Sequence, residues 1–266
     1  AADGTVAIGS EALKALTSGA NNLAIGYNAA AGVTTGNRNL VIGYSAMADS
    51  GGATVLDSDD NVFIGYQSGG GTWVTAKNNN NVAVGNYAMD AAMNGSGNNT
   101  AVGHASLGGM TTGDSNTGIG TSAGLALTTG NYNTLVGFQC GDTLIGVTHN
   151  TAMGSDALSG SSLVDQCVVI GSQAATGAVT AAADGTVAIG YAALQSLTSG
   201  AGNLAIGYHA LSSQLTGTYN IAIGYEAMDA MDGGEDHNIG IGYDVMGTMN
   251  NASSVTNLAI GSYALN

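Results

Sequence analysis

The chain of 266 residues contains 44 glycines and no proline, and its 18 acidic residues against three Lys and Arg give a formal net charge of −15. Collagen needs many prolines, and disordered segments rarely carry 44% apolar residues, so both classes are excluded. Nucleic acids and anionic membranes are bound by clusters of basic residues, which Lys14, Arg38 and Lys77 cannot form. We therefore expect an ordered, acidic protein without a nucleic-acid partner.

The sequence also lacks the marks of a membrane-spanning or secretory segment. No stretch of about 18 apolar residues is present, so we expect no transmembrane helix and no membrane insertion. The first residues, AADG, show neither the charged region nor the apolar core of a signal peptide, so any targeting signal is expected outside this segment.

One short phrase recurs along the whole chain, first in full from Asn22 to Tyr27: Asn, apolar, small, Ile, Gly, Tyr. The spacing of its glycine is 17 residues in eight of the fourteen intervals and 18 to 22 in the others. Each copy predicts one short strand that ends at the glycine, and the longest intervals predict loop insertions before Asn61 and Asn81. The repeat glycines are Gly9, Gly26, Gly43, Gly65, Gly85, Gly103, Gly120, Gly137, Gly154, Gly171, Gly190, Gly207, Gly224, Gly242 and Gly261.

The apolar triplet before each glycine predicts which side chains form the core. Its first and third residues are mostly large, as in Leu23 and Ile25, and its middle residue is usually Ala, as in Ala24. Side chains two positions apart share a face of a strand. We therefore expect Leu23 and Ile25, and Ile206 in a later copy, to point inward, and Ala24 to lie on a flat outer face.

The residues around the triplet predict the turns. Asn stands four residues before the glycine in twelve copies, including Asn22 and Asn203, and amides stacked in successive coils can form a hydrogen-bonded ladder. Gly26 and Gly207 indicate a positive φ or a close backbone approach. Tyr27 belongs to an aromatic column that is most simply a structural stack, with a glycan-binding surface or an inter-chain contact as alternatives. Thr-Thr-Gly and Thr-Ser-Gly predict a second turn.

These features predict an all-β protein, a parallel β-solenoid or β-roll of about 15 coils with a 17-residue repeat. Helical repeats need longer units of at least about 33 residues and tolerate glycine poorly. We interpret residues 1–266 as a single repeat array. Residues 2–29 match residues 183–210 at 22 of 28 positions, so we interpret 183–266 as a block duplication of the start.

The phrases TVAIG, NLAIGY, NIAIGY and NLAIGS resemble the head repeats of YadA-type trimeric autotransporter adhesins, and TTGNRNLVIGY and TTGNYNTLVGF are similar to repeats of bacteriophage tail fibres. The resemblance covers essentially the whole chain. It implies a left-handed β-roll, three chains side by side, a position on a cell or virion surface outside the cell, and no enzymatic activity.

We therefore expect a non-enzymatic structural or adhesive fibre segment that presents a rigid rod for surface attachment. Its expected partners are further copies of itself, as a homotrimer or end to end, and a cell-surface glycan or protein receptor. Two alternatives stay open: an ice-binding solenoid and an extracellular filament subunit that assembles end to end.

Few residues suggest site chemistry, and we predict no catalytic residue and no cofactor. Asp57, Asp59 and Asp60 supply oxygen ligands of the kind that Ca²⁺ prefers, but the EF-hand spacing is absent, which favours a solvated loop. Receptor contacts are expected in the insertions around Asp57 and Trp73 or from Met231 to Asp236, with Asp232 and Glu235, because loops vary without disturbing the array.

The remaining motifs have simpler interpretations. Ser122 matches G-x-S-x-G, but its first glycine is a repeat glycine, so a catalytic serine is not expected. The four histidines, His104, His149, His209 and His237, lack metal-ligand spacing. Cys140 and Cys167 replace small or polar residues of the repeat and are expected to be buried and unpaired rather than joined in a disulfide.

Overall fold

A computed structural model describes residues 3–48, 57–73, 77–249 and 255–266. Its internal contacts divide the chain into two compact units, Ala1–Tyr132 and Asn133–Asn266, which we call the N-terminal and C-terminal units. The first part of the insertion before Asn61 and residues 74–76 of the next insertion lie outside the described residues.

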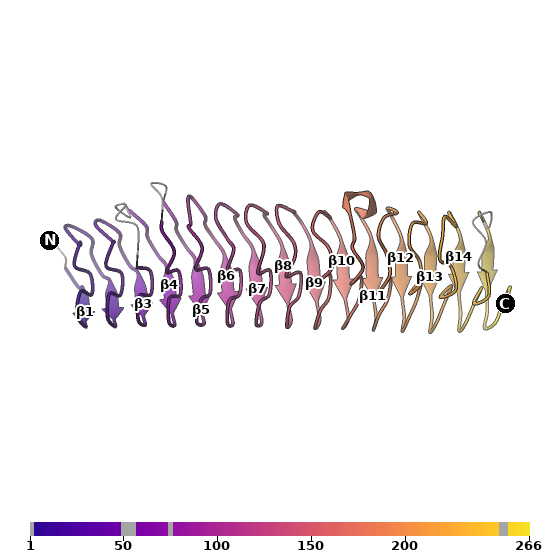
Figure 1. Cartoon of the computed structure of the whole chain (residues 1–266), viewed down its shortest axis with the longest axis horizontal. Coiled ribbons are helices and arrows are strands. Elements are labelled where there is room, and N and C mark those ends of the chain that lie inside the picture. The colour runs from indigo at the N-terminus through magenta and orange to yellow at the C-terminus, as the bar shows by residue number, and fades with distance from the viewer. Residues whose placement is uncertain (1–2, 49–56, 74–76, 250–254) are drawn as a thin grey trace. The chain divides into compact units, whose positions relative to one another are not determined.

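The N-terminal unit has one three-residue strand in each coil, where a coil is the segment from one repeat glycine to the next (Figure 1). Neighbouring strands are parallel and pair in chain order, with repeat positions opposite one another, as in Val6 with Leu23 and Ile8 with Ile25. The strands are β1 (Val6–Ile8), β2 (Leu23–Ile25), β3 (Leu40–Ile42), β4 (Val62–Ile64), β5 (Val82–Val84), β6 (Thr100–Val102) and β7 (Thr117–Ile119).

The C-terminal unit follows the same rule, with parallel pairing in chain order and one short 3₁₀ helix in an insertion. Its elements are β8 (Thr134–Val136), β9 (Thr151–Met153), β10 (Val168–Ile170), η1 (Ala181–Ala183), β11 (Val187–Ile189), β12 (Leu204–Ile206), β13 (Ile221–Ile223), β14 (Ile239–Ile241) and β15 (Leu258–Ile260). The predictions of an all-β class, a parallel solenoid and a repeat of about 17 residues are confirmed. Within the described residues, no helix is long and apolar enough to cross a membrane.

The predicted orientation of the strands is wrong. Ala24 is fully buried, whereas Leu23 and Ile25 on either side of it are half-buried and face outward. The same pattern holds in the copy that contains Ile206, where the middle residue Ala205 is fully buried. A three-residue strand points its middle side chain to one face and its two ends to the other, so each strand from β2 to β15 gives one residue to the interior, whereas all three residues of β1 are exposed.

The interior of a coil is narrow, which explains why that inward residue is small. Where it is large, at Phe63 and Leu135, a glycine stands opposite. A Cβ at Gly69 would overlap the Phe63 ring, and one at Gly141 would lie 3.0 Å from a Leu135 methyl carbon. In these two coils the absence of a side chain at the glycine makes room for the large inward residue, as close packing requires. Ala is therefore a core residue of this fold.

Both interpretations of the repeat glycine are confirmed. Gly26 has φ 136°, a conformation that side-chain-bearing residues rarely adopt. A Cβ there would also lie 2.7 Å from the carbonyl carbon of Gly43 in the next coil. Gly207 has φ 141° and would meet the Gly224 carbonyl carbon at 2.6 Å. Glycine is required at this turn for two independent reasons.

Candidate functional site

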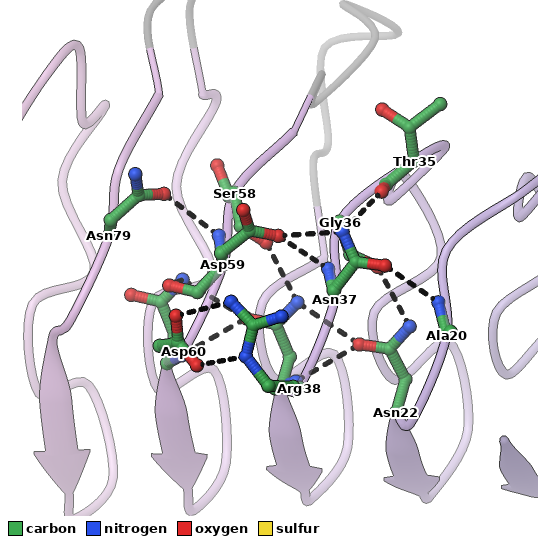
Figure 2. Close-up of polar contacts among 12 residues, drawn as sticks. Ala20, Asn22, Thr35, Gly36, Asn37, Arg38, Ser58, Asp59, Asp60 and Asn79 are labelled. Carbon is green, nitrogen blue, oxygen red and sulfur yellow. Dashed lines mark hydrogen bonds and ion pairs between the residues drawn. The ribbon is translucent and has the colours of Figure 1, made fainter. Parts of the chain in front are cut away.

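A ladder of buried asparagines runs through the N-terminal unit, as predicted. The Asn22 side-chain oxygen accepts hydrogen bonds from the Asn39 backbone N–H at 3.0 Å and from its side-chain amide at 3.1 Å, while the Asn22 amide donates to the Gly36 carbonyl at 2.8 Å (Figure 2). Each buried amide therefore ties its coil to the next at two places. The later members of this ladder are Asn61, Asn81, Asn99 and Asn116.

The ladder of the C-terminal unit has one interruption. Asn150 accepts the backbone N–H of Cys167 at 3.0 Å, but Cys167 and then Thr186 occupy the next two Asn positions. The Thr186 hydroxyl turns back to the Ala183 carbonyl at 2.7 Å. The ladder resumes at Asn203, whose oxygen accepts the Asn220 N–H at 2.9 Å. Two consecutive rungs thus lack the amide link.

The cysteines behave as predicted. Cys140 and Cys167 are free thiols, and both are buried. Burial raises the pKa of Cys140 to about 12 and that of Cys167 to about 11, because a thiolate would lose its hydration. Both are therefore unreactive at neutral pH.

A second ladder of Asn and Asp side chains lies two residues before the first one, and our sequence interpretation missed it. Asn37 accepts the Ala20 backbone N–H at 2.9 Å, Asp59 accepts the Asn37 N–H at 2.6 Å, and Asn79 accepts the Asp59 N–H at 2.8 Å (Figure 2). The signal was an Asn or Asp two positions before six of the twelve ladder asparagines. Later acceptors in the two units are Asp114, Asn131, Asp165, Asp184 and Asp236.

The three calcium candidates each bind a separate protein partner. Asp60 forms a two-point ion pair with Arg38, at 2.6 and 2.7 Å (Figure 2). Asp57 lies 2.9 Å from the Lys77 ammonium, and Asp59 belongs to the second ladder. Hydrogen bonds from Lys77 and Arg38 lower the pKa of Asp57 and Asp60, respectively. Among the residues that the structure describes, no three His, Cys, Asp or Glu side chains lie together as a metal site.

Tyrosines that follow the repeat glycine form columns of stacked rings on the surface. Ring centroids are 5.1 Å apart for Tyr27 and Tyr44, and 4.9 Å apart for Tyr208 and Tyr225, with planes 21° and 8° apart. These rings are about 40 to 50% exposed. Neighbouring rings of a stacked pair cover part of one another's faces, and the Tyr191 hydroxyl donates to the Gln173 side-chain oxygen at 3.0 Å. His209 lies against Tyr208, at 4.3 Å between ring centroids.

The outward residues of the strands form a second surface feature, which we call the strand face. In the N-terminal unit it carries the aliphatic columns of Leu23, Leu40, Ile25 and Ile42, all half-buried. In the C-terminal unit the same positions are occupied by residues such as Ile206 and Ile223. No residue of the described strands is charged, although the chain carries a net charge of −15.

Two of the predicted contact residues are buried, and that prediction is wrong for them. Trp73 is 1% exposed, donates its indole N–H to the Gly69 carbonyl at 2.8 Å and packs edge-on against Phe63. Glu235 is fully buried, and its carboxylate accepts the Gly233 backbone N–H at 2.9 Å. An insertion that folds back supplies extra core, which sequence position alone does not reveal. Asp232 is exposed, and the receptor contact there stays a prediction.

The threonines of the second turn connect neighbouring coils. The Thr17 hydroxyl donates to the Thr34 carbonyl at 2.9 Å, and the Thr198 hydroxyl donates to the Leu215 carbonyl at 2.8 Å. Each hydroxyl thereby uses its only proton within the protein. Ser122 lies in the first turn with φ 57°, at the position that Asn28 occupies in the second copy, so it is an ordinary member of the repeat.

No family model matches the chain, and a search of the curated proteins finds no match.

Proposed function

We propose that this chain is a non-enzymatic segment of an extracellular fibre, of the phage tail fibre or bacterial surface adhesin type. In this proposal three copies of a left-handed solenoid pack side by side on a virion or cell surface. The coils supply a stiff support, and exposed insertions make contact with a glycan or protein receptor.

The observation that carries the proposal is the uncharged strand face. The outward third residue of each strand, such as the half-buried Ile25, is Ile or Val except at Met153 and repeats once per coil in register. The first position is aliphatic as in Leu23, except at Thr100, Thr117, Thr134 and Thr151. Burying such an apolar surface against another protein is favourable by about 25 cal/mol for each Å² of apolar area removed from water. A second copy of the same chain has the matching coil spacing and no charge on that face, whereas other surfaces of the two copies repel each other.

Sedimentation equilibrium tests the assembly. One chain has a mass of 25.9 kDa, so we expect particles of three times that mass. Ile206→Lys places a charge on the strand face and should give single chains, because a buried ammonium without a partner is costly. Leu215→Lys is the matched control, since Leu215 is 41% exposed but lies outside the strands. A wild-type protein that sediments as one chain would contradict the trimer.

Attachment is tested separately at the exposed insertion around Asp232. Trp73 and Glu235 are buried, so they no longer belong to the proposed contact surface. A variant in which the exposed residues Asp232 and Gly234 are replaced by the shorter turn sequence of a neighbouring coil should adhere less to host cells. The mass of its assembly in sedimentation should stay the same. Unchanged adhesion would show that this insertion is not the receptor contact.

A further inference from the structure

The tyrosine columns bring together pairs of oxidisable rings that are both stacked and accessible. In the C-terminal unit, Tyr191, Tyr208, Tyr225 and Tyr243 are each 41 to 44% exposed. Successive ring centroids are 5.3, 4.9 and 5.3 Å apart, and the planes of each pair lie within 15° of parallel. One ring thus follows another at the spacing of the coils, about 4.8 Å.

We propose that this tyrosine column is a site of oxidative cross-linking, at which a peroxidase-type oxidant joins tyrosines of neighbouring coils through a carbon–carbon bond. Each of two tyrosines loses one electron and one proton to give a phenoxyl radical. The two radicals couple at the ring carbons next to the hydroxyl groups, and each of those carbons then returns its hydrogen to the phenol oxygen. Hydrogen peroxide accepts the two electrons and two protons and becomes two molecules of water.

Stacking determines which tyrosines couple. A radical on Tyr225 has Tyr208 at 4.9 Å and Tyr243 at 5.3 Å, so rotation of exposed side chains is enough to bring ring carbons together. Tyr219 is more exposed, at 57%, but the ring beside it is that of His237, at 5.3 Å and tilted by 36°. Exposure alone therefore favours reaction at Tyr219, whereas the column geometry favours Tyr208, Tyr225 and Tyr243.

Such a bond would link neighbouring coils covalently. It spans 17 residues between Tyr208 and Tyr225 and 18 between Tyr225 and Tyr243. A link of this kind restricts the unfolded chain, as a disulfide does. The chain has only two cysteines, both buried as free thiols, so the tyrosine column offers an accessible means of covalent stabilisation.

The test treats the whole chain with horseradish peroxidase and hydrogen peroxide, followed by peptide mapping by mass spectrometry. We expect the fluorescence of dityrosine and linked peptide pairs that contain Tyr191 with Tyr208, Tyr208 with Tyr225 or Tyr225 with Tyr243, each pair lighter by two hydrogens than the two separate peptides. The thermal unfolding midpoint should rise after treatment. Diluting the protein should not change the yield, because the bond forms within one chain.

Two variants separate stacking from exposure. Tyr225→Phe keeps a ring in the stack but removes the phenol. The links of Tyr225 to Tyr208 and to Tyr243 should therefore disappear, while the link between Tyr191 and Tyr208 remains. Tyr219→Phe should leave the pattern unchanged. Circular dichroism confirms that both variants fold. The proposal is overturned if no dityrosine forms, if it forms chiefly at Tyr219, or if its yield falls on dilution.

Discussion

The side-chain oxygen of Asn81 accepts hydrogen bonds from both the backbone N–H and the side-chain amide of Asn99, each at 3.1 Å. Both side chains are fully buried. The Asn99 amide also donates to the Gly113 carbonyl at 2.9 Å, so one residue connects three successive coils. Because these groups are shielded from water, each of them depends on the others for a partner.

Replacing a ladder asparagine should therefore destabilise the array strongly. Asn99→Ala leaves the amide and carbonyl groups of neighbouring coils buried without partners, at an expected cost of about 3 kcal/mol or more. Urea unfolding followed by circular dichroism measures the loss. Asn94→Ala is the control, because Asn94 is exposed and should change the midpoint little. Similar midpoints for the two variants would show that the ladder does not stabilise the fold.

The repeat glycine should tolerate no side chain. Gly207→Ala combines a φ of 141° with a carbonyl carbon 2.6 Å from the new Cβ, so we expect a loss of about 3 kcal/mol or more, or failure to fold. Gly234→Ala has no atom within 4 Å of the new Cβ and is expected to be neutral. Thermal unfolding compares them, and a stable Gly207→Ala protein would contradict the geometry.

The interrupted ladder can be completed. Cys167→Asn offers an amide to the Asn150 oxygen, and the Cys167 sulfur already lies 3.6 Å from the Ala183 carbonyl that such an amide would reach. The double variant Cys167→Asn with Thr186→Asn should gain about 1 kcal/mol for each restored hydrogen bond. Cys167→Ala serves as the control without an amide. If the double variant is no more stable than that control in urea, the local backbone geometry prevents the new amides from forming the ladder hydrogen bonds.

Gln214 is a buried polar residue that stands between the buried apolar residues Leu197 and Met231 of the adjacent coils. Within the described residues, its buried side-chain oxygen has no hydrogen-bond partner. Gln214→Leu removes the unpaired oxygen but also the hydrogen bond from the Gln214 amide to the Gly233 carbonyl at 2.8 Å, so we expect a net gain in stability of no more than about 1 kcal/mol. The reverse exchange, Leu197→Gln, should destabilise it. Chemical denaturation of both variants measures the change in the free energy of unfolding. Changes of the same sign would contradict the conclusion that a buried amide destabilises this position.

Asp142 should make stability fall as pH rises. Burial, with repulsion from Asp156, raises the pKa of this carboxyl in the folded protein above its value in the unfolded chain. The folded state therefore holds the proton more tightly, and the stability that protonation supplies is present below the unfolded pKa and lost as pH rises through the folded one. Asp142→Asn should thus stabilise the protein at pH 7 and have little effect at pH 3, as measured by urea unfolding at both values. An equal effect at both would exclude a charge-based cause.

Several features of this fold could be predicted from the sequence because they depend on local chemistry repeated many times. Asn22 and its counterparts predicted a ladder, since an amide is the side chain that can both donate to and accept from its own copy. Gly26 predicted a turn that excludes a side chain, and the structure shows both reasons for it. The free, buried state of Cys140 and Cys167 also followed from their positions in the repeat.

The orientation of the strands could not be predicted in this way. Alternation along a strand predicts that Leu23 and Ile25 share one face and that Ala24 lies on the other, but it does not predict which face is inside. We assigned the large residues to the core, whereas the inward position is Ala in most strands, and the large Phe63 fits there beside Gly69, where a Cβ would overlap its ring. The width of the interior depends on the path of the two turns that close the coil, and the residue pattern of one repeat does not predict that path.

The sequence by itself determined the period, the parallel stacking and the residues that hold one coil to the next. These contacts join the same repeat position of neighbouring coils, so the residues that make them recur from copy to copy. Only the tertiary structure decided which residues are inside, that Trp73 and Glu235 fill the core, and that Asp57, Asp59 and Asp60 take separate partners. These outcomes depend on the space between different positions of the repeat, and that space exists only after the coil has closed.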